Sequence, residues 1–523
     1  MTTIDLFNAR VWTGEGARAV PSVVRITDGR VQAIDPSNAS LRDGVRALDV
    51  EGRVLTPGLV DAHLHLTLGG QTLLHVDLSA VDSREAFEGA IEAAHANLPP
   101  SQWLIASGWN EFNWPGQARP DRSWLASAGD RPVVCWRCDW HAAVVNSAVL
   151  KKLSLPSDEV VAAAGGHVGR DRDGCLDGWL AEAAAWKWMQ PVVPELDDAQ
   201  RGEALRRGAD HLVQRGITSV RAMEYQCDIE RDILPLADLL PLRMSLVQLD
   251  RVCPLRFDWH EGVGNTDRLR LTGCKSFFDG TLGSRTARLR TDYHDTPGVR
   301  GDWLEHALHD QDQEWCQQVV EHGLSPVIHA IGDAAVGRAA SLLAAVPDAL
   351  HGTLEHCQVV SPEDLELLGG IRVSIQPTHR AVDADMTQLR LGQTRSSWVL
   401  PMADMVRAGA RLSLGTDWPI VSADPLLTLR AAITGEDQHG KPFHASQSLS
   451  PDVALRAATI DASEAIGLPA AMQVGGQGDF VIWHGDPLGD ITTASIHSTW
   501  VDAAQVAGED LSTTCNAAEA SEA

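Results

Sequence analysis

Short apolar runs alternate along most of the chain with segments that have helical spacing. The runs are rich in β-branched residues and have the length of buried strands. Eight of them follow one another in the order 59–65, 217–223, 242–249, 269–278, 325–330, 352–356, 372–377 and 411–417. Apolar residues at intervals of three and four indicate helices between several of these strands, at 313–322, 333–346, 361–369 and 400–409. Because strand and helix alternate, the pattern predicts a parallel sheet, and eight such units predict a closed (β/α)8 TIM barrel.

The two ends of the chain have a different pattern. Residues 1–55 contain short alternating runs, and a similar run, GDFVIWHGDP, returns at 478–487. One small β-domain built from both ends is the simplest arrangement. Residues 67–216, between the first two barrel strands, are far longer than an ordinary connection and predict an inserted subdomain. Residues 508–523 are polar and acidic and are expected to be disordered.

Candidate metal ligands stand at the ends of the predicted barrel strands. His63 and His65, in GLVDAHLHL, end the first run. Since a strand alternates its faces with period two, both side chains project to the same side, as a two-histidine metal site requires. The further candidates on strands four, five and six and just past strand eight are Lys275, His329, His356 and Asp417. In a barrel all of these positions face one mouth.

The order H-x-H, Lys, His, His and Asp on these strands resembles the amidohydrolase superfamily. The surrounding phrases resemble its amidohydrolase family 3 (YtcJ-like) branch, which includes N-substituted formamide deformylases. They are TPGLVDAHLHL at 56–66, GWNEFNWP at 108–115, DWHAAVVNSAVL at 139–150, CKSFFDGTLGSRTARL at 274–289, VIHAIGDAAVG at 327–337, LEHCQVVSPEDL at 354–365, GTDWPIVSADPL at 415–426 and GDFVIWHGDPL at 478–488. The resemblance implies metal-dependent hydrolysis of a C–N bond. It also implies a composite β-sandwich domain of 1–55 and 466–507 beside a barrel of 56–465.

The ligand types indicate which metal to expect. Neutral imidazoles and a carboxylate suit zinc first, and manganese, iron or cobalt next. A lysine cannot ligate a metal unless it loses its proton or is modified. In superfamily members with a lysine on strand four, that lysine is carboxylated by carbon dioxide to a bridging carbamate. The alternative for Lys275 is an ordinary ion pair with Asp279 or Asp417.

The resemblance therefore implies either one or two ions. With a carboxylated lysine as the bridge, one ion is held by His63, His65 and Asp417, and the second by His329 and His356. In either case the metal lowers the pKa of its water and polarises the substrate carbonyl. We expect Asp417 and His356 to be catalytic, with Asp417 carrying the proton from the attacking water to the leaving amine.

Supporting residues are predicted around this centre. The candidates for orienting the imidazoles are Asp279, Asp333 and Glu355. Asp333 is equally well explained as a helix-capping or turn residue. Nine of the seventeen tryptophans lie in 67–216, where they either line a substrate pocket or pack the insertion. The candidate substrate-binding residues are His141, Asn146, Trp109 and Trp418.

Three other functions stay open. An ester or carbamate hydrolase would use the same activated water. A zinc deaminase of the same superfamily places a catalytic glutamate shortly after the strand-five histidine, whereas His329 is followed by Ala-Ile-Gly-Asp333. A non-catalytic barrel scaffold is the third, but every ligand position of the family pattern is occupied here by the matching residue type.

Composition narrows the class of partner. The chain has 523 residues and a formal charge of −27, which disfavours nucleic acid and anionic membranes and leaves a small molecule as the expected partner. No basic leader or apolar segment long enough to span a membrane is visible, so we expect a cytoplasmic protein, which could form a homodimer. Nine cysteines fit reduced thiols, and Cys135-Trp-Arg-Cys138 near His141 is better explained as part of a strand than as a zinc knuckle.

Overall fold

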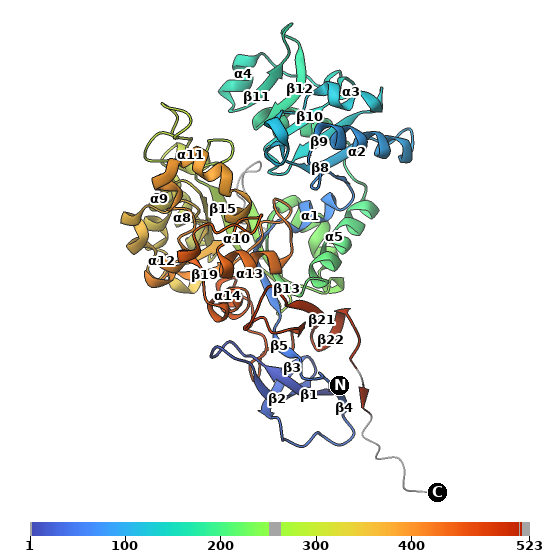
Figure 1. The fold of residues 1–523 in the computed structure, drawn as a ribbon, viewed down its shortest axis with the longest axis vertical. Coiled ribbons are helices and arrows are strands. Elements are labelled where there is room, and N and C mark those ends of the chain that lie inside the picture. The colour runs from blue at the N-terminus through green and yellow to red at the C-terminus, as the bar shows by residue number, and fades with distance from the viewer. Residues whose placement is uncertain (1–2, 250–262, 512, 515–523) are drawn as a thin grey trace. The chain divides into compact units, whose positions relative to one another are not determined.

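The computed structural model describes residues 3–249, 263–511 and 513–514 (Figure 1). The chain divides into two compact units. The first comprises the described parts of Met1–Leu66, Ala209–Trp418 and Ser422–Ala523. The second comprises Thr67–Gly208 and Pro419–Val421.

A parallel eight-stranded sheet forms the centre of the first unit. In chain order its strands are β6 (Leu59–Leu64), β13 (Ile217–Tyr225), β14 (Arg243–Leu249), β15 (Leu269–Phe277), β16 (Ser325–Ala330), β17 (Thr353–His356), β18 (Arg372–Ile375) and β19 (Arg411–Leu414). The segment after β19 returns to β6, because the Asp417 N–H donates to the His63 carbonyl at 2.7 Å and the His65 N–H donates to the Trp418 carbonyl at 2.8 Å. The eight predicted strands and the (β/α)8 barrel are thus confirmed.

Helices connect the barrel strands. α8 (Asp312–Glu321), α9 (Asp333–Leu343) and α12 (Met402–Arg407) match three of the predicted segments. The fourth, 361–369, is a 3₁₀ helix, η10 (Pro362–Leu368), and not an α-helix. Pro362 is its first residue and Gly369 its C-cap, and the apolar spacing in this segment did not distinguish a 3₁₀ helix from an α-helix. Later helices in this unit include α13 (Pro425–Thr434), α14 (Pro451–Ala457) and α15 (Ile460–Ala465).

Both chain ends contribute to one nine-stranded sheet in the same unit. Its strands are β1 (Thr3–Val11), β2 (Val20–Thr27), β3 (Arg30–Pro36), β4 (Arg46–Asp49), β5 (Val54–Pro57), β20 (Phe480–His484), β21 (Ser495–Val501), β22 (Ala504–Gly508) and β23 (Thr513–Thr514). The antiparallel pairing of β5 with β20 joins the two ends. Side chains from both ends share one core, where the rings of Phe480 and Trp500 stack at 5.2 Å. The additional β-domain predicted from the sequence is therefore present.

The segment 508–523 is not wholly disordered as expected. Thr513 and Thr514 form β23, which pairs with Leu48 and Ala47 of β4. An edge strand offers unpaired backbone groups, so even a polar segment can add to it. Residues 512 and 515–523 lie outside the described residues.

The second unit is a separate α/β layer within the stretch predicted as an insertion. Its six strands are β7 (Val76–Asp77), β8 (Leu104–Trp109), β9 (Val133–Arg137), β10 (Ala142–Val145), β11 (His167–Arg170) and β12 (Leu176–Ala181). Helix α2 (Arg84–Asn97) is capped by Ser83, whose hydroxyl accepts from the Ala86 N–H. Phe87 of α2 packs edge-on against Trp109, Trp114 and Trp124. The chain leaves the insertion through α5 (Asp198–Val213), which precedes β13.

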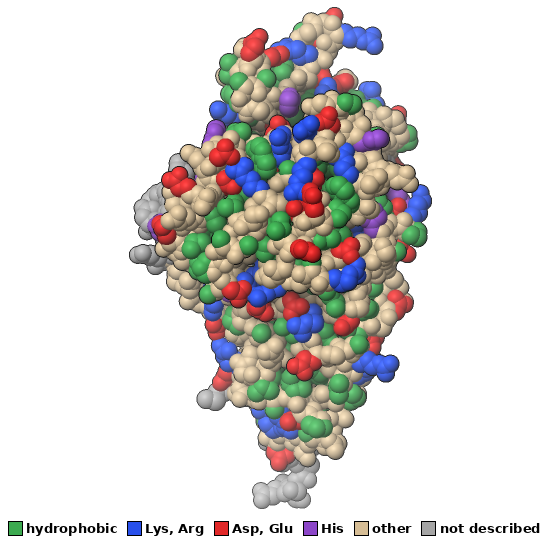
Figure 2. Space-filling model, turned by 90° about the vertical axis from the view of Figure 1, so that its left-hand side faces the viewer, with side chains coloured by type: hydrophobic (Ala, Val, Ile, Leu, Met, Phe, Trp, Pro, Cys, Tyr) green, Lys and Arg blue, Asp and Glu red, His purple; other side chains and the backbone are tan. Residues whose placement is uncertain are grey.

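The surface carries both signs of charge despite the acidic composition. On the face drawn in Figure 2, acidic and basic side chains are interspersed with neutral and apolar ones. Cys135 has a free thiol buried in β9, and Cys138 directly follows that strand. Among the described residues, no helix combines the length and the apolar character that a membrane crossing requires.

Candidate metal centre

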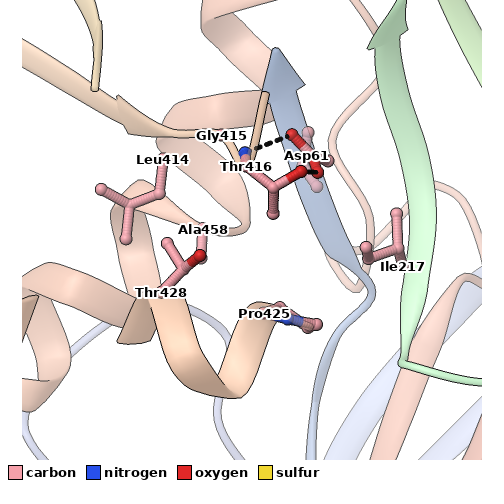
Figure 3. A pocket seen from close by; sticks show the side chains of 9 residues that line it. Asp61, Ile217, Leu414, Gly415, Thr416, Pro425, Thr428 and Ala458 are labelled. Carbon is pink, nitrogen blue, oxygen red and sulfur yellow. Dashed lines mark hydrogen bonds between the residues drawn. The ribbon is translucent and has the colours of Figure 1, made fainter. Parts of the chain in front are cut away.

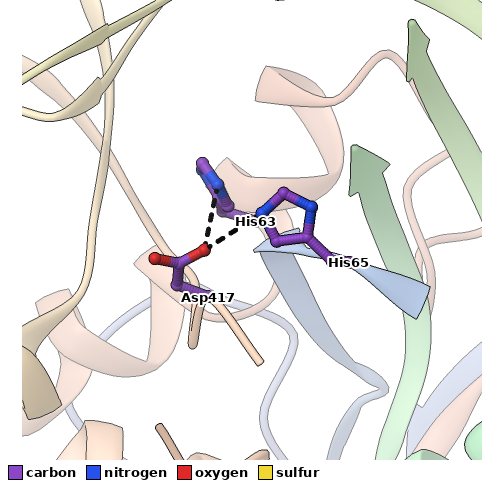
Figure 4. Close-up of side chains that lie close together, drawn as sticks. All are labelled: His63, His65 and Asp417. Atoms are coloured by element: carbon purple, nitrogen blue, oxygen red, sulfur yellow. Dashed lines mark ion pairs between the residues drawn. The ribbon is translucent and has the colours of Figure 1, made fainter. Parts of the chain in front are cut away.

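Two histidines and one aspartate converge where barrel strands one and eight meet. His63 Nε2 lies 3.3 Å and His65 Nε2 3.4 Å from Asp417 Oδ1 (Figure 4). Asp417 has a positive φ of 62°, a strained conformation that its backbone bond to His63 holds in place. A Cβ atom at Gly415 would come within 2.7 Å of the backbone nitrogen of His63, so glycine is needed for this close approach of the two strands.

The outer nitrogens of the first two histidines are held by hydrogen bonds. The His63 Nδ1–H donates to Glu355 Oε2 at 2.5 Å, and the His65 Nδ1–H donates to the Met223 carbonyl at 3.0 Å. Such bonds fix the tautomer, so each Nε2 lone pair is directed at the point near Asp417. Two imidazole nitrogens and a carboxylate oxygen are a donor set that fits a divalent metal ion. These three residues could therefore hold one ion.

The other carboxylate oxygen of Asp417 faces a second group. His379 Nε2, from α10 (Pro377–Val382), lies 3.9 Å from Asp417 Oδ2. His356, at the end of β17, completes this group, and its Nδ1–H donates to Gln376 Oε1 at 2.8 Å. Asp417 thus stands between two sets of imidazoles.

His329 and Lys275 lie at the same mouth. The rings of His329 and His356 are 4.4 Å apart, and His329 Nε2 lies 3.2 Å from the Gly280 carbonyl oxygen. Lys275 is buried, with its Nζ 2.9 Å from His63 Nε2. The lone pair of His63 Nε2 cannot bind this ammonium and a metal ion at once. A metal at His63 therefore requires Lys275 to move or to change its chemical state.

Charge at this centre favours a cation. Burial alone would raise the pKa of Asp417, but His63 and His65 hold that pKa well below its usual range. Burial and Lys275 depress the pKa of His63, yet Glu355 and Asp417 raise it above its usual value. The two buried carboxylates thus favour positive charge at His63, which a metal ion would supply. Burial, and then His329, lower the pKa of His356 well below its usual value, which keeps it neutral.

The three predicted orienting residues differ in what they contact. Glu355 bonds directly to His63, as described above. Asp279 accepts from the N–H groups of Arg288, Ile331 and Gly332 at 2.8–3.0 Å, and burial raises its pKa to about 7. Asp333 accepts from the Arg290 N–H at 3.0 Å. Asp279 and Asp333 therefore hold loops, although Asp279 Oδ1 is also 3.7 Å from His329 Nε2.

Three residues at or beside the site were missed by the sequence analysis. Gln376 lies in the seventh apolar run, 372–377, and His379 follows that run, where a histidine just after a barrel strand was the available signal. A third, Asp61, accepts from the Thr416 hydroxyl at 2.6 Å and ties strand one to strand eight. Burial raises the pKa of Asp61 to about 6.

Asp61 and Thr416 also line a small pocket (Figure 3). The walls are mostly apolar, from residues such as Ile217, Leu414 and Pro425. None of the candidate metal ligands is among the residues that line it. We therefore regard this pocket as a packing gap in the barrel wall.

Two predicted substrate-binding residues make structural contacts within the second unit. Trp109 is fully buried in the core of the second unit, and its ring stacks on Trp114 at 6.1 Å. The Asn146 side chain accepts from the Val133 N–H at 3.2 Å and donates to the Arg131 carbonyl at 2.7 Å, which satisfies it without a ligand. A polar or aromatic residue in an apolar segment also fits a satisfied core position, and a role of these two residues in substrate binding stays a prediction.

The remaining two candidates are partly or wholly enclosed. His141 Nδ1 lies 3.1 Å from both carboxylate oxygens of Glu182, and the His141 side chain is 18% exposed. Trp418 is buried and stacks on His211 at 5.2 Å. Of the four, His141 keeps the most access to solvent.

Comparison with known proteins identifies the family of this chain. The sequence matches the amidohydrolase family over residues 46–509. It is 29% identical to Protein LONG AFTER FAR-RED 3 of Arabidopsis thaliana, over 95% of this chain and 90% of that protein. It is 28% identical to a Bacillus subtilis (strain 168) protein named "Putative amidohydrolase YtcJ", over 86% and 87% of the two chains. It is 23% identical to the N-substituted formamide deformylase of Arthrobacter pascens, over 96% and 98%.

The fold has a close counterpart among solved structures. An uncharacterized metal-dependent hydrolase from Pyrococcus horikoshii OT3 superposes with a TM-score of 0.75 at 24% identity, covering 94% of this chain and 99% of that one. The family match spans most of the chain and includes every candidate ligand. The chain therefore belongs to the amidohydrolase family.

Proposed function

We propose that the protein hydrolyses an amide-type C–N bond of a small molecule in a zinc-dependent reaction. The observation that carries this proposal is the convergence of His63 Nε2 and His65 Nε2 on one oxygen of Asp417 at the barrel mouth. The likeness to a formamide deformylase along nearly the whole chain supports a C–N bond as the target.

The donors present suit zinc. His63, His65 and Asp417 would hold one ion, and His356 with His329 would hold a second. When bound, zinc supplies a Lewis acid that makes water nucleophilic near neutral pH and polarises the scissile carbonyl. His356 stays neutral because of its burial, so its lone pair is available at neutral pH.

Asp417 is suited to move the proton of the reaction. Its Oδ1 faces His63 and His65, whereas its Oδ2 is turned toward His379. The Asp417 carboxylate would accept a proton from the attacking water. A weakly basic carboxylate also gives that proton up readily. Asp417 would therefore pass it to the leaving nitrogen, which departs as an amine.

Lys275 is proposed to carry a carbamate when the centre is loaded. Burial disfavours the ammonium, and the neutral amine can attack carbon dioxide. A N–C bond then forms at Nζ and one proton is released. This change would free His63 Nε2 from the lysine and replace a cation with an anion. Both effects would favour two metal ions over one.

Substrates with matched acyl groups test the bond that is cleaved. A formamide and the corresponding formate ester share the formyl group and differ in the leaving group, whereas the corresponding carbamate carries an alkoxy group in place of the formyl hydrogen. The proposal predicts amine release from the formamide or a related N-acyl compound, and loss of that activity in Asp417→Asn. Cleavage of the esters alone would refute an amide-type target. Release of ammonia from an aromatic amine would indicate a deaminase instead.

A further inference from the structure

A second group of potential metal ligands lies in the β-domain of the first unit. It consists of His484 at the end of β20, His497 in β21 and Glu509 just after β22. One ligand atom from each lies within 4.8 Å of the others. His497 is buried, whereas the side chains of His484 and Glu509 are 40% and 69% exposed. No step of the proposed hydrolysis uses these residues.

The sheet itself brings these side chains together. His484 pairs with Ser495 across the antiparallel strands, and the register shifts between Ile482 and Trp483. His497 is the extra residue of the resulting bulge, because Ile482 pairs with Ser498 and Trp483 with Ile496. Bulges of this kind re-aim one side chain. The rings of His497 and His484 consequently lie 4.8 Å apart.

A glycine brings the carboxylate to the histidines. Gly508 has a φ of 92°, and a side chain there would come within 2.2 Å of the His497 carbonyl oxygen. Only glycine permits this approach of β22 to the bulge. The next residue, Glu509, donates its N–H to the His497 carbonyl at 2.9 Å. The carboxylate of Glu509 is therefore positioned beside both rings.

The distances between donor atoms suit a tetrahedral ion. Metal–ligand bonds of about 2.0–2.2 Å at tetrahedral angles separate neighbouring ligand atoms by roughly 3.4 Å. Glu509 Oε1 lies 3.4 Å from His484 Nε2, and the other oxygen, Oε2, lies 3.8 Å from His497 Nε2, so a turn of the carboxylate would bring one oxygen toward both rings. His497 Nδ1 contacts the Ser498 hydroxyl at 3.1 Å, which orients the ring with Nε2 toward the carboxylate.

We propose that His484, His497 and Glu509 bind one divalent transition-metal ion, with zinc as the best match, at a site distinct from the barrel centre. Two imidazoles and a carboxylate make a borderline nitrogen and oxygen donor set, and the fourth position would be open to water. The ion would link β20, β21 and the segment after β22. It would therefore stabilise the sheet that both chain ends build.

Zinc binding to the intact enzyme tests this site. The enzyme keeps its barrel metal and is dialysed into zinc-free buffer, and added Zn²⁺ is followed by calorimetry and by the shift in Tm. We expect wild type to bind one equivalent that His484→Gln binds at least tenfold more weakly, with the zinc-induced rise in Tm reduced to match. His497→Gln should show the same loss. His167→Gln, at an exposed histidine of the second unit, is the matched control and should bind like wild type.

Two results would overturn the proposal. One is an equal zinc stoichiometry and affinity in wild type and His484→Gln. The other is the absence of any zinc-induced rise in Tm in wild type. Because His497 is buried, His497→Gln could fail to fold, and the partly exposed His484 and Glu509 then carry the test through His484→Gln and Glu509→Gln. The barrel ligands are unchanged in all of these variants, so failure here leaves the proposed hydrolysis untouched.

Discussion

Replacing Glu355 by glutamine isolates the charge behind the metal-facing histidine. Glu355 is fully buried and accepts from His63 Nδ1–H at 2.5 Å. Glutamine keeps an oxygen in the same place but removes the negative charge. The hydrogen bond to His63 therefore persists, while its electrostatic support for a cation is lost.

The expected magnitude follows from that change. A buried hydrogen bond to a charged group contributes about 1.5–3 kcal/mol and a neutral one about 0.5–1.5 kcal/mol, so the substitution removes about 1–1.5 kcal/mol. This corresponds to a loss of about tenfold in metal affinity. Glu355→Ala also removes the bond itself and should approach the hundredfold loss typical of a ligand whose supporting partner is deleted.

Folding stability will change as well. Arg221 is buried with its Nη1 3.8 Å from Glu355 Oε1. Removing one member of a buried charge pair costs about 3–5 kcal/mol, so Glu355→Gln should unfold at a lower temperature. Metal affinity must therefore be measured well below the Tm of the variant, by competition with a chelator of known affinity.

Glu363→Gln is the matched control. The Glu363 side chain is 71% exposed and pairs with Arg290 at the surface, so its substitution should leave metal affinity unchanged. A Glu355→Gln enzyme that binds metal as tightly as wild type would refute the idea that Glu355 supports the ion through His63. An equal loss of metal affinity in Glu363→Gln would also refute this idea, because Glu363 does not contact His63.

Three further predictions concern residues of the first unit. Asp417→Asn should lower turnover by about 10²–10⁴-fold while most of the metal stays bound, whereas His63→Ala should lose both activity and metal; near-normal turnover in Asp417→Asn would assign the proton to another group. Lys275→Ala should reduce metal content and regain part of its activity when a short-chain carboxylic acid is added, and full metal occupancy without the lysine would exclude a bridging carbamate. Burial lowers the pKa of His211 to about 4, so the unfolded chain binds more protons than the folded one between about pH 6.5 and 4, and stability falls as the pH drops through that window. His211→Phe keeps an aromatic ring beside Trp418. In denaturant titrations it should lose about 1–2 kcal/mol less stability over this pH range than wild type, after allowance for solvent screening. The same pH dependence of stability in both proteins would contradict the lowered pKa of His211.

The barrel could be predicted from the sequence because its strands are buried on both faces. β6, β16, β17 and β18 contain only buried residues, and such strands appear as continuous apolar runs. Helix type was harder to predict. The spacing in 361–369 fits an α-helix, but the segment forms the 3₁₀ helix η10, and its terminal proline and glycine do not explain the difference, because α13 has both and is an α-helix.

The site was predictable where strand order alone brings residues together. His63 and His65 share a face by alternation, and Asp417 follows the strand that closes the barrel. Residues placed by loops or by tertiary packing were not predictable in this way. His379 reaches Asp417 only through the start of α10, and Trp109 is buried because Phe87 and Trp114 pack around it.

Anomalous X-ray scattering at the zinc absorption edge tests the central claim most directly, in crystals of protein purified without chelator. The ligand geometry predicts a peak about 2.0–2.2 Å from His63 Nε2, His65 Nε2 and an oxygen of Asp417. That peak should be lost in His63→Ala while any peak at His484 persists. A barrel mouth without a peak, before and after soaking in zinc and, at their own edges, in manganese and cobalt, would contradict a metal-dependent centre at these residues.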